Sequence, residues 1–76
     1  MKTVGIKLSS IQDVRDFVET VCKYDIDIDL ASGRYVVDAK SIMGIFSLDL
    51  LQTITLTAHS DDCDKLFADL DKFIVK

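Results

Sequence analysis

Asp25-Ile26-Asp27-Ile28-Asp29-Leu30 alternates between carboxylates and aliphatic side chains without an exception. Successive side chains of a β-strand point to opposite faces, so this pattern predicts a strand with one buried face and one solvated acidic face. Ser32-Gly33 follows as a tight turn, because glycine adopts a positive φ without strain. Residues 34–39 then return as a second strand, whose apolar side carries Tyr35, Val37 and Ala39. The middle of the chain therefore predicts a β-hairpin.

A strand and an amphipathic helix are expected before this hairpin. Residues 3–8 alternate, with Val4, Ile6 and Leu8 on one side, which indicates a half-buried strand. Ser10, followed by Asp13 three residues later, is typical of a helix N-cap. The helix should end near Tyr24, and its apolar stripe at helical spacing comprises Ile11, Val14, Phe17, Val18, Val21 and Cys22.

The segment Lys40-Ser41-Ile42-Met43-Gly44-Ile45-Phe46-Ser47-Leu48 follows the hairpin and is almost wholly apolar after its first two residues. It is too short to span a membrane, which takes about 20 apolar residues. Its adjacent apolar pairs do not fit the alternation of a strand. Ser41 fits the N-cap of a short helix. We therefore expect a small apolar helix with a modifiable hydroxyl at its N-terminus, on a surface that meets a partner and can be switched.

The end of the chain predicts one more strand and one more helix. Residues 53–58 alternate, with threonines on the solvated side. Ser60 or Asp61 is expected to cap a final helix whose continuous stripe comprises Cys63, Leu66, Phe67, Leu70, Phe73 and Ile74. The element order is then βαββαβα. Since every strand has one apolar face, we expect an α+β fold, a two-layer open-faced sandwich with a four-stranded antiparallel sheet, two long helices on one face and the short helix at an edge.

Composition narrows the class of protein. Seventy-six residues fit a single domain, 1–76. A net charge of −4 argues against a nucleic-acid partner, which would require a basic stripe. The first residues lack the apolar core of a signal peptide, so a cytoplasmic location away from the membrane is expected. Cys22 and Cys63 have no metal-binding spacing; we interpret both as buried thiols, with a disulfide as the lesser alternative, and expect no metal and no cofactor.

Two stretches resemble the phosphocarrier protein HPr of the bacterial sugar phosphotransferase system. Residues 40–48 match the serine-site signature of that family nearly residue for residue, and residues 23–30 resemble the end of its first helix and its second strand. The resemblance implies the sandwich fold. It also implies that Ser41 is the regulatory serine, which a dedicated kinase phosphorylates so that the phosphoprotein binds a transcription regulator. A phosphate at a helix N-terminus meets free N–H groups and the positive end of the dipole.

The family's carrier motif, G-[IL]-H-A-R-P, is not preserved. The matching stretch is Leu8-Ser9-Ser10-Ile11-Gln12-Asp13, which places Ser10 at the histidine position, Gln12 at the arginine and Asp13 at the proline. The histidine carries phosphate as a labile phosphoramidate, whereas a serine phosphoester is too stable for onward transfer. The extra carboxylate also opposes a phosphate dianion. The only histidine, His59, is expected at the other end of the domain as a solvated loop residue that does not substitute.

Each of these features has a plainer interpretation. Ser41 caps a helix whether or not it is modified, and Ile42, Met43 and Phe46 could close the edge of the core instead of meeting a partner. The alternating aspartates give few converging ligands, and Asp61, Asp62 and Asp64 match no calcium loop, so neither group predicts a metal site.

Three functions remain on the sequence alone. The first is a non-catalytic HPr-like regulatory or binding protein, with no enzyme activity, that contacts phosphotransferase-system proteins, a serine kinase or a transcription regulator through Lys40, Ile42, Met43 and Phe46. The second is a working phosphocarrier that uses a non-standard residue. The third is a small phosphatase of the acylphosphatase kind, which would need a glycine-rich anion loop with an arginine that the scattered glycines do not supply. The oligomeric state is left open, since exposed edge strands would allow pairing.

Overall fold

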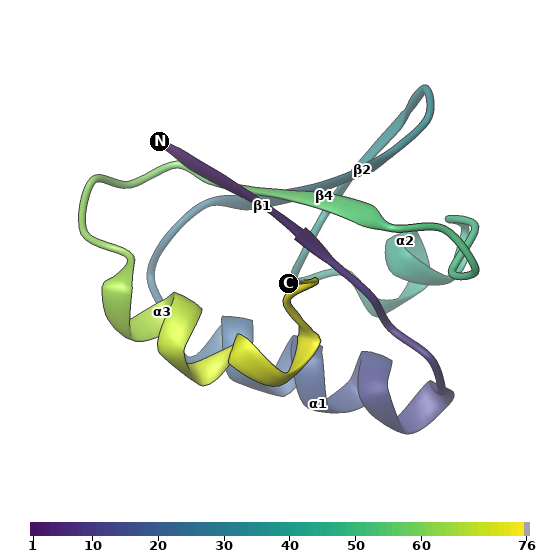
Figure 1. Ribbon diagram of the computed structural model, residues 1–76, viewed down its shortest axis with the longest axis horizontal. Helices are drawn as coiled ribbons and strands as arrows, with labels where there is room; N and C mark the ends of the chain where they lie inside the picture. The colour runs from purple at the N-terminus through teal and green to yellow at the C-terminus, as the bar shows by residue number, and fades with distance from the viewer. Residues whose placement is uncertain (76) are drawn as a thin grey trace.

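The computed structural model describes residues 1–75 and shows an antiparallel sheet with its helices packed on one face (Figure 1). The strands lie in the order β1-β4-β2-β3 across the sheet. The predicted α+β open-faced sandwich is therefore confirmed. In chain order the elements are β1 (Lys2–Ile6), α1 (Ile11–Cys22), β2 (Ile28–Ser32), β3 (Tyr35–Asp38), α2 (Ile42–Phe46), β4 (Ile54–Ala58), α3 (Asp64–Asp69) and the 3-10 turn η1 (Asp71–Phe73).

The core lies between the sheet and the helices. Along β4, Ile54, Leu56 and Ala58 are fully buried, whereas the alternate threonines reach the other face. The helical layer contributes Phe17 from α1, which is fully buried and meets the ring of Phe73 edge-on with the centroids 5.8 Å apart. Burial of one such aromatic or aliphatic side chain stabilises the fold by about 1.5–3 kcal/mol. This continuous layer holds α1 and α3 against the sheet.

The first half of the predicted strand 25–30 is not part of the sheet. β2 begins at Ile28, which pairs with Ala58, and continues to Ser32, two residues beyond the predicted end. β4 ends at Ala58, so residues before Ile28 have little partner strand to pair with. A single bond from the His59 amide to the Asp27 carbonyl (2.8 Å) ends the ladder. Alternation predicted the buried face of this strand correctly but not where its pairing starts.

The predicted hairpin turn is confirmed, with Gly33 at φ +60°, in the left-handed region that favours glycine. The predicted apolar side of the return strand is only partly correct. Ala39 is buried beyond the end of β3 and Val37 is half-buried, but Tyr35 is 68% exposed. β3 is the edge strand, and Tyr35 lies next to the turn, where no helix covers it.

The final helix is shorter than predicted and differently capped. Neither Ser60 nor Asp61 is the N-cap; that position is held by Cys63, whose side chain makes no capping bond. Ser60 instead accepts a hydrogen bond from the Asp62 amide, which forms a local turn that delays the helix. After six residues the chain tightens at Leu70 into η1, and Ile74 leaves the predicted helical stripe. Only α1 is therefore a long helix.

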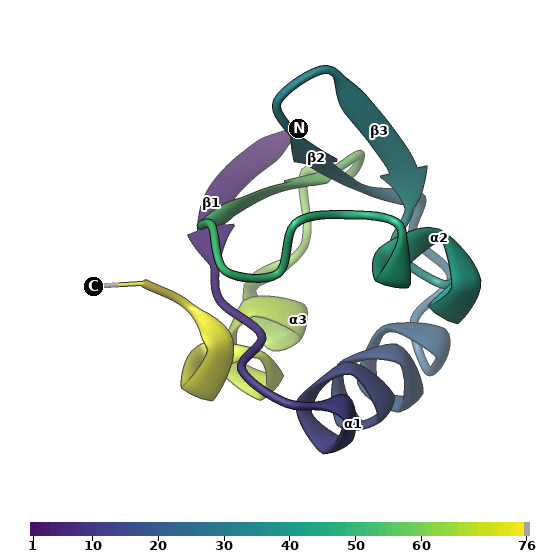
Figure 2. The same cartoon turned by 90° about the vertical axis from the view of Figure 1, so that its right-hand side faces the viewer.

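Ile74 leaves the helical stripe because it joins the sheet. It forms an isolated antiparallel bridge with Ile6, flanked by the bonds from the Lys7 amide to the Phe73 carbonyl (2.8 Å) and from the Val75 amide to the Gly5 carbonyl (2.9 Å). In Figure 2 this C-terminal segment lies beyond β1, at the side of the sheet opposite to β3. The outer edge of β1 is thus covered by residues 73–75.

Two residues of the predicted α1 stripe face solvent. Val14, Phe17 and Val21 are buried as expected, but Ile11 is 67% exposed and Cys22 is also exposed. Both stand at the ends of the helix, where the sheet no longer lies above them. The prediction that both cysteines are buried is therefore wrong for Cys22 and correct for Cys63, and both thiols are free. Among residues 1–75, no helix is long and apolar enough to cross a bilayer.

Candidate functional site

The short helix α2 forms where the sequence predicted it, with Ser41 as its N-cap. The Ser41 side chain accepts a hydrogen bond from the Gly44 amide (3.2 Å), and its carbonyl accepts from the Ile45 amide (3.0 Å). At the other end the Ser47 hydroxyl donates to the Gly44 carbonyl (2.6 Å) and closes the helix. Serines at both ends thus stabilise a five-residue helix that would be marginal by itself.

The apolar residues of α2 divide between the core and the surface. Ile45 is fully buried and Leu48 is 6% exposed, so these two anchor the segment in the core. Met43 is 77% exposed and Phe46 is 42% exposed, whereas Ile42 is half-buried. Large apolar side chains displayed together on a rigid helix are typical of a contact site. We call Ile42, Met43 and Phe46, with Ser41 at their head, the α2 surface.

The α2 surface continues onto α1 and onto the loop before β4. α1 and α2 contact each other, and Ile42 lines a groove with Gln12, Arg15, Val18 and Glu19 of α1. A second, apolar hollow beside the start of α1 includes Ile11 and Leu51, which are 67% and 82% exposed. The sequence reasoning missed both residues. The apolar pair Leu50-Leu51, between the predicted short helix and the predicted strand 53–58, was the signal that could have identified this extension.

Lys40 is a link between elements rather than a free surface cation. Its ammonium group donates to the Tyr24 carbonyl, just after α1, over 2.7 Å, and its amide donates to the Asp38 carboxylate over 2.9 Å. The side chain is partly buried at this position. Lys40 therefore fixes the start of α2 against the end of α1, and its predicted contact with a partner stays a prediction.

Tyr24, which accepts the bond from Lys40, also connects this end of α1 to α3. Its hydroxyl donates to the Asp69 carboxylate at the end of α3, and this hydrogen bond raises the pKa of the phenol above its ordinary value of 10.0. Residues 24, 40 and 69 thus tie α1, α2 and α3 together at one end of the helical layer.

We expect the substitution Lys40→Met to lower the free energy of unfolding by about 1–2 kcal/mol, because it removes a charge-assisted hydrogen bond but keeps the aliphatic stem. The midpoint of urea denaturation measures this change. Lys23→Met is the matched control, since Lys23 is exposed at the end of the same helix and should leave the midpoint unchanged. Equal midpoints for the two variants would contradict the role given to Lys40.

At the start of α1, Ser10 is the N-cap that the sequence predicted. Its hydroxyl accepts from the Asp13 amide (3.1 Å), and the Asp13 carboxylate accepts from the Ser9 amide (2.9 Å). Gln12 donates to Asp16 one turn on (2.9 Å). The positive end of the α1 dipole is therefore already satisfied by a resident carboxylate, and its first turn contains no basic side chain. An incoming phosphate dianion would be repelled there.

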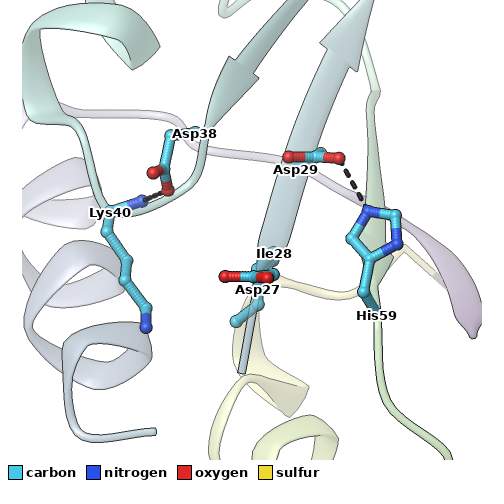
Figure 3. Close-up of a pocket in the computed structure, with 6 residues that line it drawn as sticks. All are labelled: Asp27, Ile28, Asp29, Asp38, Lys40 and His59. Carbon is cyan, nitrogen blue, oxygen red and sulfur yellow. Dashed lines mark hydrogen bonds and ion pairs between the residues drawn. The ribbon is translucent and has the colours of Figure 1, made fainter. Parts of the chain in front are cut away.

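His59 lies at the opposite end of the sheet from Ser10, as expected, because Lys2 of β1 pairs with Ala58 while Ile6 leads towards α1. It is not simply a solvated loop residue. Its Nε2 lies 2.7 Å from the Asp29 carboxylate, on the outer face of the sheet. Figure 3 shows the two in a polar hollow that Asp27, Asp38 and Lys40 also line. Within residues 1–75 no three His, Cys, Asp or Glu side chains converge as metal ligands.

The comparisons agree with this geometry. The family described as "PTS HPr component phosphorylation site" matches residues 13–76. The match covers most of the sequence, and the chain belongs to this HPr family of phosphocarrier proteins. Family members are not themselves catalytic enzymes, and they act by contact with other proteins. The matched region begins just after Ser10 and Gln12. No curated protein matches the chain by sequence alone.

Solved structures of the family resemble the whole chain. HPr-C-His from Thermoanaerobacter tengcongensis has 32% sequence identity and a TM-score of 0.80, covering 95% of this chain and 89% of its own. HPr from Bacillus anthracis str. Ames has 27% identity and a TM-score of 0.72, over 97% and 94% of the two chains. Crh of Bacillus subtilis, a swapped, intertwined dimer, has 26% identity and a TM-score of 0.65, over 93% and 88%.

Proposed function

We propose that this chain is a non-catalytic regulatory or docking protein of the HPr type. Partners recognise it through the α2 surface, a serine kinase phosphorylates it on Ser41, and it does not carry phosphoryl groups for transport. The observation that supports this most is the display of Met43 and Phe46 on a helix that begins at an exposed serine. A cytoplasmic location follows from this proposal, since the kinase and the regulators of this family act there.

Phosphorylation of Ser41 would change the α2 surface without refolding the domain. The residue is exposed, and within residues 1–75 the one hydrogen bond of its hydroxyl is the 3.2 Å bond from the Gly44 amide, which a phosphate oxygen could accept instead. The phosphate would bring about −1.5 to −2 units of charge next to Ile42 and Met43. An apolar contact surface would thereby acquire an anionic edge, which favours a partner with arginines and disfavours one with acidic groups.

Two features support the absence of a carrier role. Ser10 offers an oxygen nucleophile whose phosphoester is too stable for onward transfer, and Asp13 places a carboxylate where the phosphate would lie. His59 lies at the opposite end of the sheet from the start of α1, and its ring is engaged with Asp29. A carrier centred on His59 would hold its phosphate at the opposite end of the sheet from the family's carrier position at the start of α1.

The proposal is tested with the HPr serine kinase and ATP, followed by intact-protein mass spectrometry. We expect one phosphate per chain on Ser41, and complete loss of labelling in Ser41→Ala. Ser47→Ala is the matched control, because this serine is exposed at the other end of the same helix and should leave labelling intact. Labelling that persists in Ser41→Ala, or no labelling of the folded wild-type chain, would contradict the proposal.

A further inference from the structure

The two edges of the sheet differ in whether a further segment covers them. The outer edge of β1 is covered by residues 73–75, whereas no described segment pairs with the outer edge of β3. Figure 2 shows β3 at the free side, away from the C-terminal segment. Natural proteins protect such edges with lysine, proline or a bulge. β3 is short and ends in Asp38, which also give an edge some protection, but its sequence Tyr-Val-Val-Asp has no lysine, proline or bulge and exposes Tyr35 (68%) and Val36 (66%).

The backbone groups that point outward from β3 can be identified. The Ala39 amide donates to the Ile28 carbonyl of β2, so residue 39 faces the sheet interior. In an antiparallel ladder the alternate residues turn their N–H and C=O groups to the other side. Val36 therefore points both its amide and its carbonyl to solvent. The next alternate residue, Asp38, points its amide outward. A second strand can add to this edge with Val36 at its centre.

We propose that β3 pairs with β3 of a second copy of this chain, antiparallel and with Val36 opposite its own equivalent on the two-fold axis. Five two-fold registers use outward-pointing groups, centred on residues 34, 35, 36, 37 and 38; those centred on 35 and 37 place no carboxylate opposite Arg34. The registers centred on 34 and 38 place like charges directly opposite each other, which destabilises a strand pair. The register centred on Val36 places Arg34 opposite Asp38 of the other copy, and Tyr35 opposite Val37.

Side-chain facing agrees with this register. Val36 lies opposite Ala31 and Asp38 opposite Asp29, so both belong to the outer face of the sheet, together with Arg34 by alternation. Tyr35 and Val37 share the helical face, where Val37 pairs with buried Leu30. Arg34 is exposed and forms no hydrogen bond or ion pair with residues 1–75, so its guanidinium is available to the second copy.

The resulting dimer would be an isologous, continuous eight-stranded sheet with all helices on one face. Its contact is small, because β3 has only four residues, so the area lies below that of stable dimers and association should be weak and reversible. The two α2 surfaces would lie on the same side of the joint sheet, one on each side of the axis. This pairing does not depend on phosphorylation of Ser41.

Sedimentation equilibrium of the full chain tests the proposal, with protein between roughly 20 µM and 2 mM to bracket the affinity of so small an interface. We expect a reversible dimer, and concentration-dependent amide shifts in NMR spectra at residues 34–38. Arg34→Asp and Asp38→Arg should each weaken dimerisation by about tenfold or more, since each converts two opposite-charge pairs into like-charge pairs. The double variant, with the charges exchanged, should restore it.

Controls separate this interface from other causes. Lys65→Asp and Asp25→Arg change the net charge by the same amounts at exposed positions outside β3 and should leave the dimer intact. Val36→Pro removes an outward amide that β2 does not use, so it should abolish the dimer while circular dichroism shows an intact fold. The proposal is overturned by a chain that stays monomeric, by a dimer that survives Val36→Pro, by amide shifts elsewhere, or by a charge exchange that fails to restore pairing.

Discussion

The substitution Phe17→Ala should remove a large part of the stability of this chain and lower its melting temperature strongly. Phe17 is completely buried at the centre of the helical layer and packs edge-on against Phe73. Truncation of a buried phenylalanine costs about 3–5 kcal/mol. A domain of 76 residues has a total free energy of unfolding of about 4–11 kcal/mol, so the loss would amount to at least about a quarter of the stability. The melting temperature, followed by circular dichroism, should fall by roughly 15–30 °C.

Ile11→Ala is the matched control for this loss. Ile11 lies on the same helix but is 67% exposed, and alanine is the better helix former. Its melting temperature should change by no more than the equivalent of about 0.5 kcal/mol. Similar melting temperatures for Phe17→Ala and Ile11→Ala would contradict the stabilising role given to the buried Phe17.

Three substitutions at the start of α1 should convert a chain that accepts no phosphoryl group from phosphoenolpyruvate into one that does. Incubated with the general phosphotransferase enzyme and phosphoenolpyruvate, the wild-type chain should form no acid-labile phosphoprotein. The variant Ser10→His, Gln12→Arg, Asp13→Pro restores the imidazole nucleophile, adds a cation and removes the carboxylate that holds the Ser9 amide. We expect a phosphohistidine that is lost in acid, detected with radiolabelled phosphoenolpyruvate.

The controls test whether the gained phosphoryl labelling comes from the introduced histidine. Gln12→Arg with Asp13→Pro, but without the histidine, should remain unlabelled. A second triple variant with Asp13→Asn keeps a side-chain acceptor for the Ser9 amide and guards against misfolding caused by proline. If the wild-type chain is labelled and the His59→Ala variant is not, the chain is a working carrier centred on His59. If both triple variants fold but remain unlabelled, the altered carrier motif does not explain why the wild-type chain accepts no phosphate from phosphoenolpyruvate.

The layers and the buried faces of this fold could be predicted from the sequence. Alternation identified Ile28, Leu30, Ile54 and Leu56 as core, and the helical period did the same for Val14 and Phe17. Both patterns follow from local backbone geometry, so no long-range information was needed. The N-caps Ser10 and Ser41 are local as well and were predicted correctly.

The errors concern features that depend on distant parts of the chain. Alternation in residues 25–27 could not show that β4 ends at Ala58, and the stripe through Ile74 could not show that Ile6 was available as a partner. Cys22 and Ile11 lie beyond the covering sheet, a limit set by strand lengths elsewhere. At the site, the pairing of His59 with Asp29 joins residues 30 positions apart and left no local signal.

The bridge between β1 and residues 73–75 also determines the order in which this protein can be assembled during synthesis. β1 emerges from the ribosome before the other strands, yet its neighbours in the sheet are β4 and residues 73–75. The β2–β3 hairpin and the α1–α2 contact can form early, whereas β1 must wait until β4 and residues 73–75 are free. Closing so long a loop slows folding. A nascent chain stalled before β4 would therefore hold Val4 and Ile6 unpaired and would be a natural client of chaperones.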